Sequence, residues 1–187
     1  TPVEYLGERC LQLTALHPDG NAQYSAEVAR LNSQDLLTQL DNRSFFMMRI
    51  ETAIRTAVQK GIFSSLIIIE VNDFENISVA IGKSSSNLVL NDIALYLQGA
   101  INQPCAAGRL DDHLFGIILH DGDPDAALAL CRQIREKINN RISSAMLASL
   151  ELNCSVGMTL INGHALNAND IIERARTNMK RELGSVS

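Results

Sequence analysis

The sequence predicts a mixed α/β (α+β) fold with a largely antiparallel sheet. Apolar residues make up 46% of the chain and charged residues 20%, which is typical of a packed globular core. Segments of helical and strand periodicity are mixed along the chain, and two short apolar segments, 106–110 and 115–119, read as a β-hairpin in its middle. This order argues against a doubly wound parallel sheet. The 187 residues suffice for one domain and an appendage.

In the first 34 residues, the sequence predicts a strand and a connecting helix. Residues 7–16 read as a strand that ends at the turn-forming cluster 17–21. Tyr24, Val28 and Leu31 then recur at helical spacing among charged and polar residues. Such a narrow apolar stripe suits a linker helix that pairs with another helix.

Capping and turn-forming residues mark the boundaries of the next predicted elements. Ser44 is a candidate cap for a helix that ends at Gly61. Residues 66–71 are rich in β-branched side chains and read as a buried central strand. A second long helix runs from about Asn87 to Pro104.

The last third predicts two helices and one strand. Asp123-Pro124 opens a helix, with proline at its first position. A strand follows at about 150–160, and Asn169 or Asp170 caps a final helix.

Charge and composition exclude several classes of function. A net charge of −5 argues against a surface that binds a nucleic acid polymer. The longest apolar run, 66–69, is far shorter than the roughly 20 residues of a membrane helix, so we expect no membrane insertion. The four cysteines form no Cys-x-x-Cys pair, which favours a reducing cytoplasm. Because the chain starts with Thr1, we expect it to be part of a longer protein.

Polar side chains mark the ends of two predicted strands. Carboxylates that converge from two strands are what a divalent cation carrying a nucleotide triphosphate needs. Polar residues also populate strand ends and turns for conformational reasons alone, so both interpretations stay open. The residues concerned are Glu70, Asn72 and Asp73 on one side, and Asp111, Asp112 and His113 on the other.

Four ordered segments resemble a known family. Residues 35–43 (DLLTQLDNR) are similar to its Asp-x-Leu-Thr-Gly-Leu-x-Asn-Arg motif, and 69–77 (IEVNDFENI) to its Ile-Asp-x-Asp-x-Phe-Lys-x-Ile motif. Residues 108–115 (GRLDDHLF) fall where it has Ala-Arg-Leu-Gly-Gly-Asp-Glu-Phe, and 154–158 resemble its later Ser-Ile-Gly-Val strand. The family is that of GGDEF domains, diguanylate cyclases that make cyclic di-GMP from two GTP. The resemblance implies a five-stranded, mainly antiparallel sheet wrapped by helices, as in adenylyl cyclases.

The resemblance also implies a degenerate active site. The first metal-binding aspartate of the family falls on Glu70, and its two signature glycines become acidic residues. Those glycines let the nucleotide phosphates approach the backbone, whereas carboxylates repel them. The signature positions are Asp111, Asp112, His113, Leu114 and Phe115, so the metal-holding acid is His113 and its acidic neighbour is Leu114.

Other positions of the family's site are altered as well. Among the polar positions of the family's site, Arg109 matches the family's residue well. The two guanine-selecting residues fall on Ser78 and Asn87, a phosphate-binding lysine falls on Leu183, and the Arg-x-x-Asp motif of product inhibition falls on Asn102 and Cys105.

We therefore expect a catalytically inactive regulatory module, without catalytic residues and without a cofactor, where active relatives use Mg²⁺ and GTP. One alternative is a regulatory domain that binds GTP without turnover, and another is an active cyclase with unusual ligands. A zinc or manganese ion held by Glu70, His113 and one of the two aspartates is a further alternative.

The domain organisation follows from the same resemblance. Residues 1–21 look like the end of a PAS-like sensor, 22–34 like a linker helix and 35–184 like a degenerate GGDEF domain. The pattern is similar to FimX-type PAS-GGDEF-EAL signalling proteins. It implies adjacent PAS-like and EAL-like domains in the same chain and a homodimer formed through the linker helix.

Overall fold

The computed structural model describes residues 2–5, 8–11, 28, 32–101, 105–120, 123–139 and 152–184, without the side chains of 2–11 and 182–184. The chain divides into two compact units, Thr1–Asn32 and Ser33–Ser187.

The first unit contains a β-hairpin where one strand was predicted. Strand β1 (Pro2–Tyr5) pairs antiparallel with β2 (Glu8–Leu11). Residues 8–11 are extended as predicted, but the preceding strand was missed, and 12–16 lie outside the described residues. Most of the predicted linker helix also lies outside them, although Val28, Asn32 and Ser33 are helical.

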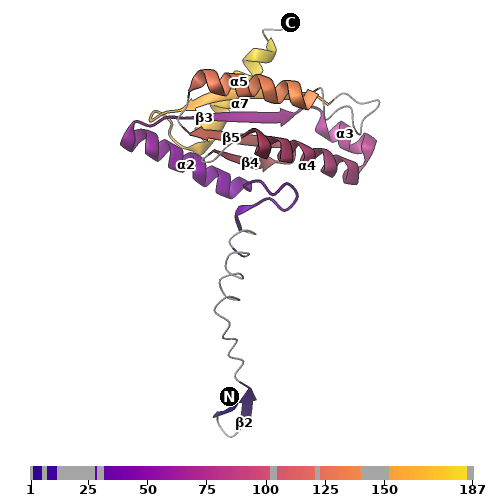
Figure 1. Ribbon diagram of the computed structural model, residues 1–187, viewed down its shortest axis with the longest axis vertical. Coiled ribbons are helices and arrows are strands. Elements are labelled where there is room, and N and C mark those ends of the chain that lie inside the picture. Colours follow the sequence, from indigo (N-terminus) through magenta and orange to yellow (C-terminus); the bar gives the residue numbers. More distant parts are fainter. Residues whose placement is uncertain are drawn as a thin grey trace. The chain divides into compact units, whose positions relative to one another are not determined.

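The second unit is built on an antiparallel sheet with the order β4-β5-β3-β6 (Figure 1). The sheet has four strands in the described part of the chain, where five were expected. The hairpin predicted at 106–119 is present as β4 and β5, and the apolar segment at 66–71 is an interior strand, as predicted. The strands are β3 (Ser64–Val71), β4 (Ala106–Asp111), β5 (Leu114–His120) and β6 (Cys154–Ile161).

Five helices cover the sheet in the described residues (Figure 1). They are α2 (Arg43–Lys60), α3 (Phe74–Ile81), α4 (Lys83–Ala100), α5 (Pro124–Lys137) and α7 (Ala168–Gly184).

Strand β3 is buried on both faces because helices cover both sides of the sheet. Successive side chains of a strand point to opposite faces. Accordingly, Ile67 and Ile69 enter the core cluster that contains α3, α4 and α5 residues. Leu66 and Ile68 enter a second cluster with α2 and α7 residues. This arrangement explains a continuous apolar run in an antiparallel sheet, where alternation is the commoner pattern.

Two predicted helix caps were wrong by a few residues. Asn42, and not Ser44, caps α2, because its extended backbone precedes the helix and its side chain accepts a hydrogen bond from the Phe45 amide. Asn167, and not Asn169 or Asp170, performs this role at α7, since it accepts a hydrogen bond from the Asp170 amide. In both cases a neighbouring polar residue competed for the cap in the sequence.

Other boundaries also differ from the expectation. The short helix α3 was missed, and α4 begins at Lys83 instead of Asn87. Gly82, with a φ of 80°, separates the two helices, a conformation that glycine adopts without strain. The Asp123-Pro124 start of α5 and the Gly61 end of α2 are confirmed. Strand β6 begins at Cys154, later than the predicted residue 150.

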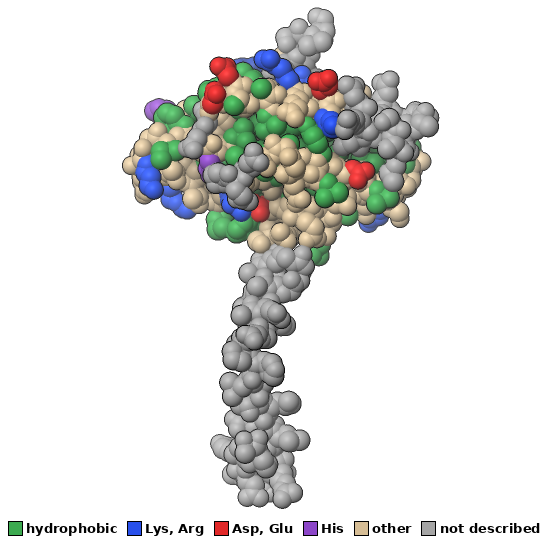
Figure 2. Space-filling view, viewed as in Figure 1, with side chains coloured by type: hydrophobic (Ala, Val, Ile, Leu, Met, Phe, Trp, Pro, Cys, Tyr) green, Lys and Arg blue, Asp and Glu red, His purple; other side chains and the backbone are tan. Residues whose placement is uncertain are grey.

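No helix in the described part of the chain is long and apolar enough to cross a membrane. On the face shown in Figure 2, acidic and basic side chains are interspersed and do not form a field of one sign.

Candidate functional site at the β4–β5 turn

The turn between β4 and β5 carries the acidic tip predicted from the sequence. The side chain of Asp111 accepts a hydrogen bond from the Asp112 amide at 2.9 Å. The strand pairing shifts register between Arg109 and Asp111, just before the turn. Both aspartates are exposed, so two carboxylates protrude at the end of the hairpin.

Arg109 ties this turn to the segment that follows the linker helix. Its Nη1 lies 3.3 Å from Oδ1 of Asp35. The same guanidinium donates hydrogen bonds to the carbonyl oxygens of Asp111 (3.3 Å) and Asp112 (2.8 Å). Asp35 in turn accepts hydrogen bonds from the amide and the hydroxyl of Thr38, at 2.9 and 2.7 Å. One arginine therefore joins the turn at the start of the second unit to the acidic hairpin.

This network sets the ionisation of Asp35. Partial burial by itself raises the pKa of its carboxyl group. The two hydrogen bonds from Thr38 and the charge of Arg109 outweigh that effect and hold the pKa below its ordinary value. Asp35 is thus an ionised anchor at neutral pH.

His113 and Glu70, which the sequence places at the ends of two strands, lie close together. Nε2 of His113 lies 3.6 Å from Oε1 of Glu70, which is near the end of β3. The imidazole stacks on the ring of Phe74, with centroids 6.2 Å apart and planes at 25°. The backbone carbonyl of His113 accepts a hydrogen bond from the Val71 amide at 3.0 Å. The ring of His113 is therefore held between β3 and the start of α3.

The next two residues belong to the core. Leu114 is 2% exposed and pairs with Glu70 across the sheet, and Phe115 is fully buried. Neither offers a polar atom of its side chain to a ligand.

A pocket of about 470 Å³ opens beside the turn. It unites residues that α3, α4, β4 and the turn contribute, far apart in the sequence. Of the predicted site positions, the lining includes Ser78, Asn87, Arg109, Asp112 and His113.

Sequence reasoning missed other residues of this pocket. Phe74, Glu75, Lys83 and Ser86 also line it. The first two lie on α3, which was not predicted, and the last two lie on the first turn of α4, which was placed too late. Lys83 precedes Asn87 by four residues, so the helical period was the signal that could have found it.

Two predicted residues play other parts. Oδ1 of Asn72 accepts a hydrogen bond from the Ser155 hydroxyl at 2.9 Å, which links β3 to β6. Asp73 is exposed in a left-handed conformation before α3. Across the described residues, no group of three or more His, Cys, Asp or Glu side chains could hold a metal ion.

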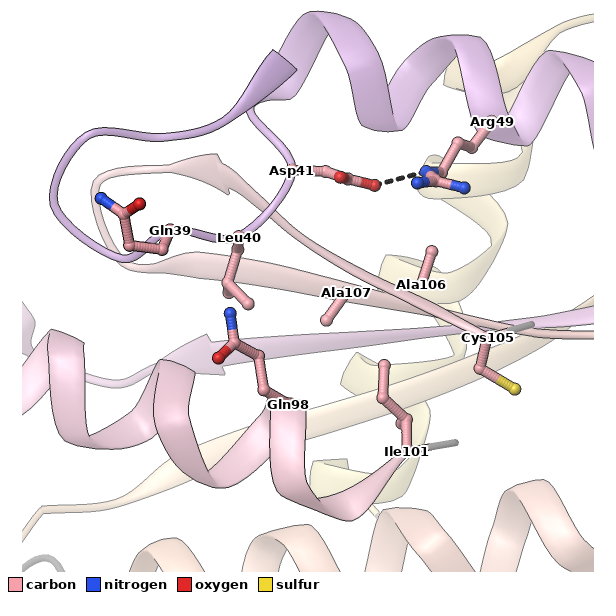
Figure 3. A pocket seen from close by; sticks show the side chains of 9 residues that line it. All are labelled: Gln39, Leu40, Asp41, Arg49, Gln98, Ile101, Cys105, Ala106 and Ala107. Carbon is pink, nitrogen blue, oxygen red and sulfur yellow. Dashed lines mark ion pairs between the residues drawn. The ribbon is translucent and has the colours of Figure 1, made fainter. Parts of the chain in front are cut away.

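A second pocket, of about 300 Å³, lies between α2, α4 and β4 (Figure 3). Asp41 and Arg49 form an ion pair on one side, and Gln98, Ile101 and Cys105 lie on the other. Burial raises the pKa of Asp41, and Arg49 offsets this only in part. Of the two positions onto which the resemblance places the product-inhibition motif, Cys105 lines this pocket, whereas Asn102 lies outside the described residues.

Comparison with solved structures shows the same fold. The coiled coil and GGDEF domain of DgcB from Caulobacter crescentus, solved in complex with c-di-GMP, superimposes with a TM-score of 0.80 at 18% identity, over 89% of this chain and 88% of that one. The FimX GGDEF domain from Pseudomonas aeruginosa gives a TM-score of 0.71 at 23% identity, over 80% and 92% of the two chains.

Sequence relatives include a diguanylate cyclase and a response regulator. Diguanylate cyclase A of Treponema denticola is 21% identical over 154 residues, which cover 81% of this chain and 42% of that protein. Response regulator PleD of Caulobacter vibrioides is 27% identical, over 83% and 34% of the two chains. The chain thus spans between 28% and 52% of the length of the curated relatives it matches. The model of the family described as diguanylate cyclase, GGDEF domain, matches residues 32–184, and the chain therefore belongs to the GGDEF family.

Proposed function

We propose that this chain is a catalytically silent GGDEF module of a cytoplasmic cyclic di-GMP signalling protein. In this proposal it relays between a PAS-like sensor and an output domain, of the EAL type. The observation that carries it is the turn at residues 111–113. It presents two exposed carboxylates and a paired histidine, and it is followed by a buried leucine.

The residues at this turn are unsuited to metal-bound GTP. A two-metal clamp needs several carboxylates around both ions. Here Glu70 faces the imidazole of His113, and Leu114 is buried. Asp112 adds negative charge to the pocket where the family's glycines give phosphates access to the backbone.

The ionic network at the turn supports a relay. Asp35 comes directly after the linker helix, and Arg109 connects it to the carbonyl groups of the turn. Movement of the linker helix therefore has a direct route to the pocket. The PAS-like and EAL-like neighbours, and a homodimer formed through the linker helix, are parts of this proposal.

Product formation tests the proposal. The protein is incubated with GTP and Mg²⁺, with an active GGDEF cyclase as positive control, and cyclic di-GMP is quantified by mass spectrometry. We expect no product above a control without protein. Product that disappears in the Glu70→Ala variant would contradict a silent site.

A second function is a regulatory domain that binds a nucleotide without turning it over. The pocket beside the turn favours it, because Ser78, Asn87, Arg109 and His113 still line one cavity. Binding without product in the same assay would support this version over a purely structural role.

A further inference from the structure

We propose that Asn162 is a site of spontaneous deamidation, with the backbone nitrogen of Gly163 as the attacking atom and water as the second reactant. Asn162 and Gly163 form the only Asn-Gly pair of the sequence and directly follow β6. Ile161 pairs with Ser64 at the start of β3, so the Asn-Gly pair lies at the end of the sheet opposite the β4–β5 turn. The proposal is therefore independent of the proposed function.

The attacking nitrogen of Gly163 is accessible to solvent. Gly163 is exposed, and its backbone N–H donates no hydrogen bond to any other residue that the structure describes. An amide proton that is not held in a hydrogen bond can be removed by hydroxide, which turns the nitrogen into a nucleophile. Gly163 also lacks a side chain, so nothing on its own Cα crowds the approach of this nitrogen to the Asn162 side chain.

The side-chain amide of Asn162 is held against the turn that contains this nitrogen. Its Oδ1 accepts a hydrogen bond from the His164 backbone N–H at 3.2 Å. This bond closes a ring of the Asx-turn type around the Gly163 peptide, which keeps Cγ of Asn162 near the nitrogen and draws electrons away from Cγ. The Nδ2 group of Asn162 makes no hydrogen bond within the described part of the chain, so no such bond retains the leaving group.

The reaction balances with water as its only added reactant. The deprotonated nitrogen of Gly163 forms a bond to Cγ of Asn162, the Cγ–Nδ2 bond breaks, and the NH₂ group takes up a proton from water and leaves as ammonia. The product is a succinimide ring. Water then opens this ring at one or the other of its carbonyl carbons, which gives aspartate or isoaspartate. Both products add a negative charge, and isoaspartate also lengthens the backbone between β6 and α7 by one carbon atom.

Asn167 provides the contrast within the same loop. The residue is exposed, and its Oδ1 also accepts a backbone hydrogen bond, from Asp170 at 3.0 Å. However, the nitrogen that follows it belongs to Ala168, which is buried and donates to Oε1 of Glu51 at 2.7 Å. This nitrogen is therefore not available for attack, and the Cβ of Ala168 adds crowding. We expect Asn167 to stay intact while Asn162 reacts.

Peptide mass spectrometry of the whole chain after incubation at mildly alkaline pH tests the proposal. We expect Asn162 to deamidate about tenfold or more faster than Asn167, because glycine leaves the attacking nitrogen uncrowded. The rate should rise with pH, and the products should include isoaspartate, identified by electron-transfer fragmentation. In Gly163→Ala the rate at Asn162 should fall about tenfold or more, since a Cβ restricts the backbone conformations that permit attack. Gly99→Ala makes the same substitution in α4 and should leave the rate unchanged.

A thermal melt first establishes that Gly163→Ala is folded. A Cβ at this position would lie 3.3 Å from Cγ2 of Val58, a contact that a small shift of this exposed side chain relieves. If the variant does not fold, Asn162→Gln replaces it: the longer side chain cannot close a succinimide, whereas direct hydrolysis of its amide would persist. Deamidation of Asn162 no faster than that of Asn167, aspartate without isoaspartate, or an unchanged rate in either variant would overturn the proposal.

Discussion

At the residue scale, the ring of Phe46 lies against two glycines that face each other across β4 and β5. A Cβ atom added to Gly108 would lie 2.4 Å from Cδ2 of that ring, and one added to Gly116 would lie 2.6 Å from Cε1. Phe46 is fully buried, so its ring has no free space into which to retreat. We predict that Gly108→Ala lowers the free energy of unfolding by about 1–3 kcal/mol, measured by urea denaturation.

Gly99 provides the matched control. It lies in α4, and a Cβ added there would meet no atom within 4 Å. Gly99→Ala should be neutral or stabilise the protein by up to about 1 kcal/mol, because alanine favours a helix over glycine. Equal stability of the Gly108→Ala and Gly99→Ala variants would contradict the packing described for Phe46.

At the element scale, the anchor between Asp35 and Arg109 predicts a pH dependence of stability. The pKa of Asp35 is lowered in the folded state, so its carboxylate stabilises the fold above the unfolded pKa of about 3.8. That contribution is lost as the pH falls through the lower folded pKa. We predict that Asp35→Asn costs about 1 kcal/mol at pH 6 and that the difference from the original protein shrinks toward pH 3.

Asp41 is the control for the sign of this effect. Its pKa is raised by burial, so folding favours its protonated form. The stability of the original protein relative to Asp41→Asn should therefore increase as the pH falls through that raised pKa. Parallel pH profiles for the two variants would show that the anchor does not act as described.

The sequence predicts a helix or strand well where its apolar pattern extends over many residues. The buried run of β3, the hairpin of β4 and β5, and the start of α5 follow directly from apolar patterns and from Asp123-Pro124. Helix α3 has only eight residues, too few to establish a helical period, and it adjoins α4 at Gly82. That omission also hid part of the pocket. The proximity of His113 and Glu70 is consistent with their places at the ends of strands, whereas the hydrogen bond between Ser78 and Ser86 depends on how two helices pack.

At the scale of the whole molecule, the apolar stripe of the linker helix predicts that this helix contributes to oligomer formation and to the output response. Val28 is helical and 41% exposed, and the sequence places Leu31 on the same stripe. An isolated helix of about a dozen residues is marginal in water, so this stripe needs a partner. In a longer protein with its output domain, we predict that Val28→Glu combined with Leu31→Glu reduces the oligomer mass, measured by light scattering, and alters the output response.

Arg30→Glu tests whether charge alone produces that effect, because Arg30 lies among the polar positions of the same segment. It should leave both mass and response unchanged. If the double variant behaves like this control, the linker is a static brace and carries no signal.

A catalytically silent module requires that the β4–β5 turn does not hold a metal-bound triphosphate. The most direct measurement is calorimetric titration with GTP in the presence and in the absence of Mg²⁺. Because the His113 imidazole lies beside the Glu70 carboxylate and Asp112 lines the pocket, we predict that Mg²⁺ does not strengthen GTP binding. A tenfold or greater increase in GTP affinity with Mg²⁺, lost in Glu70→Ala, would contradict the account.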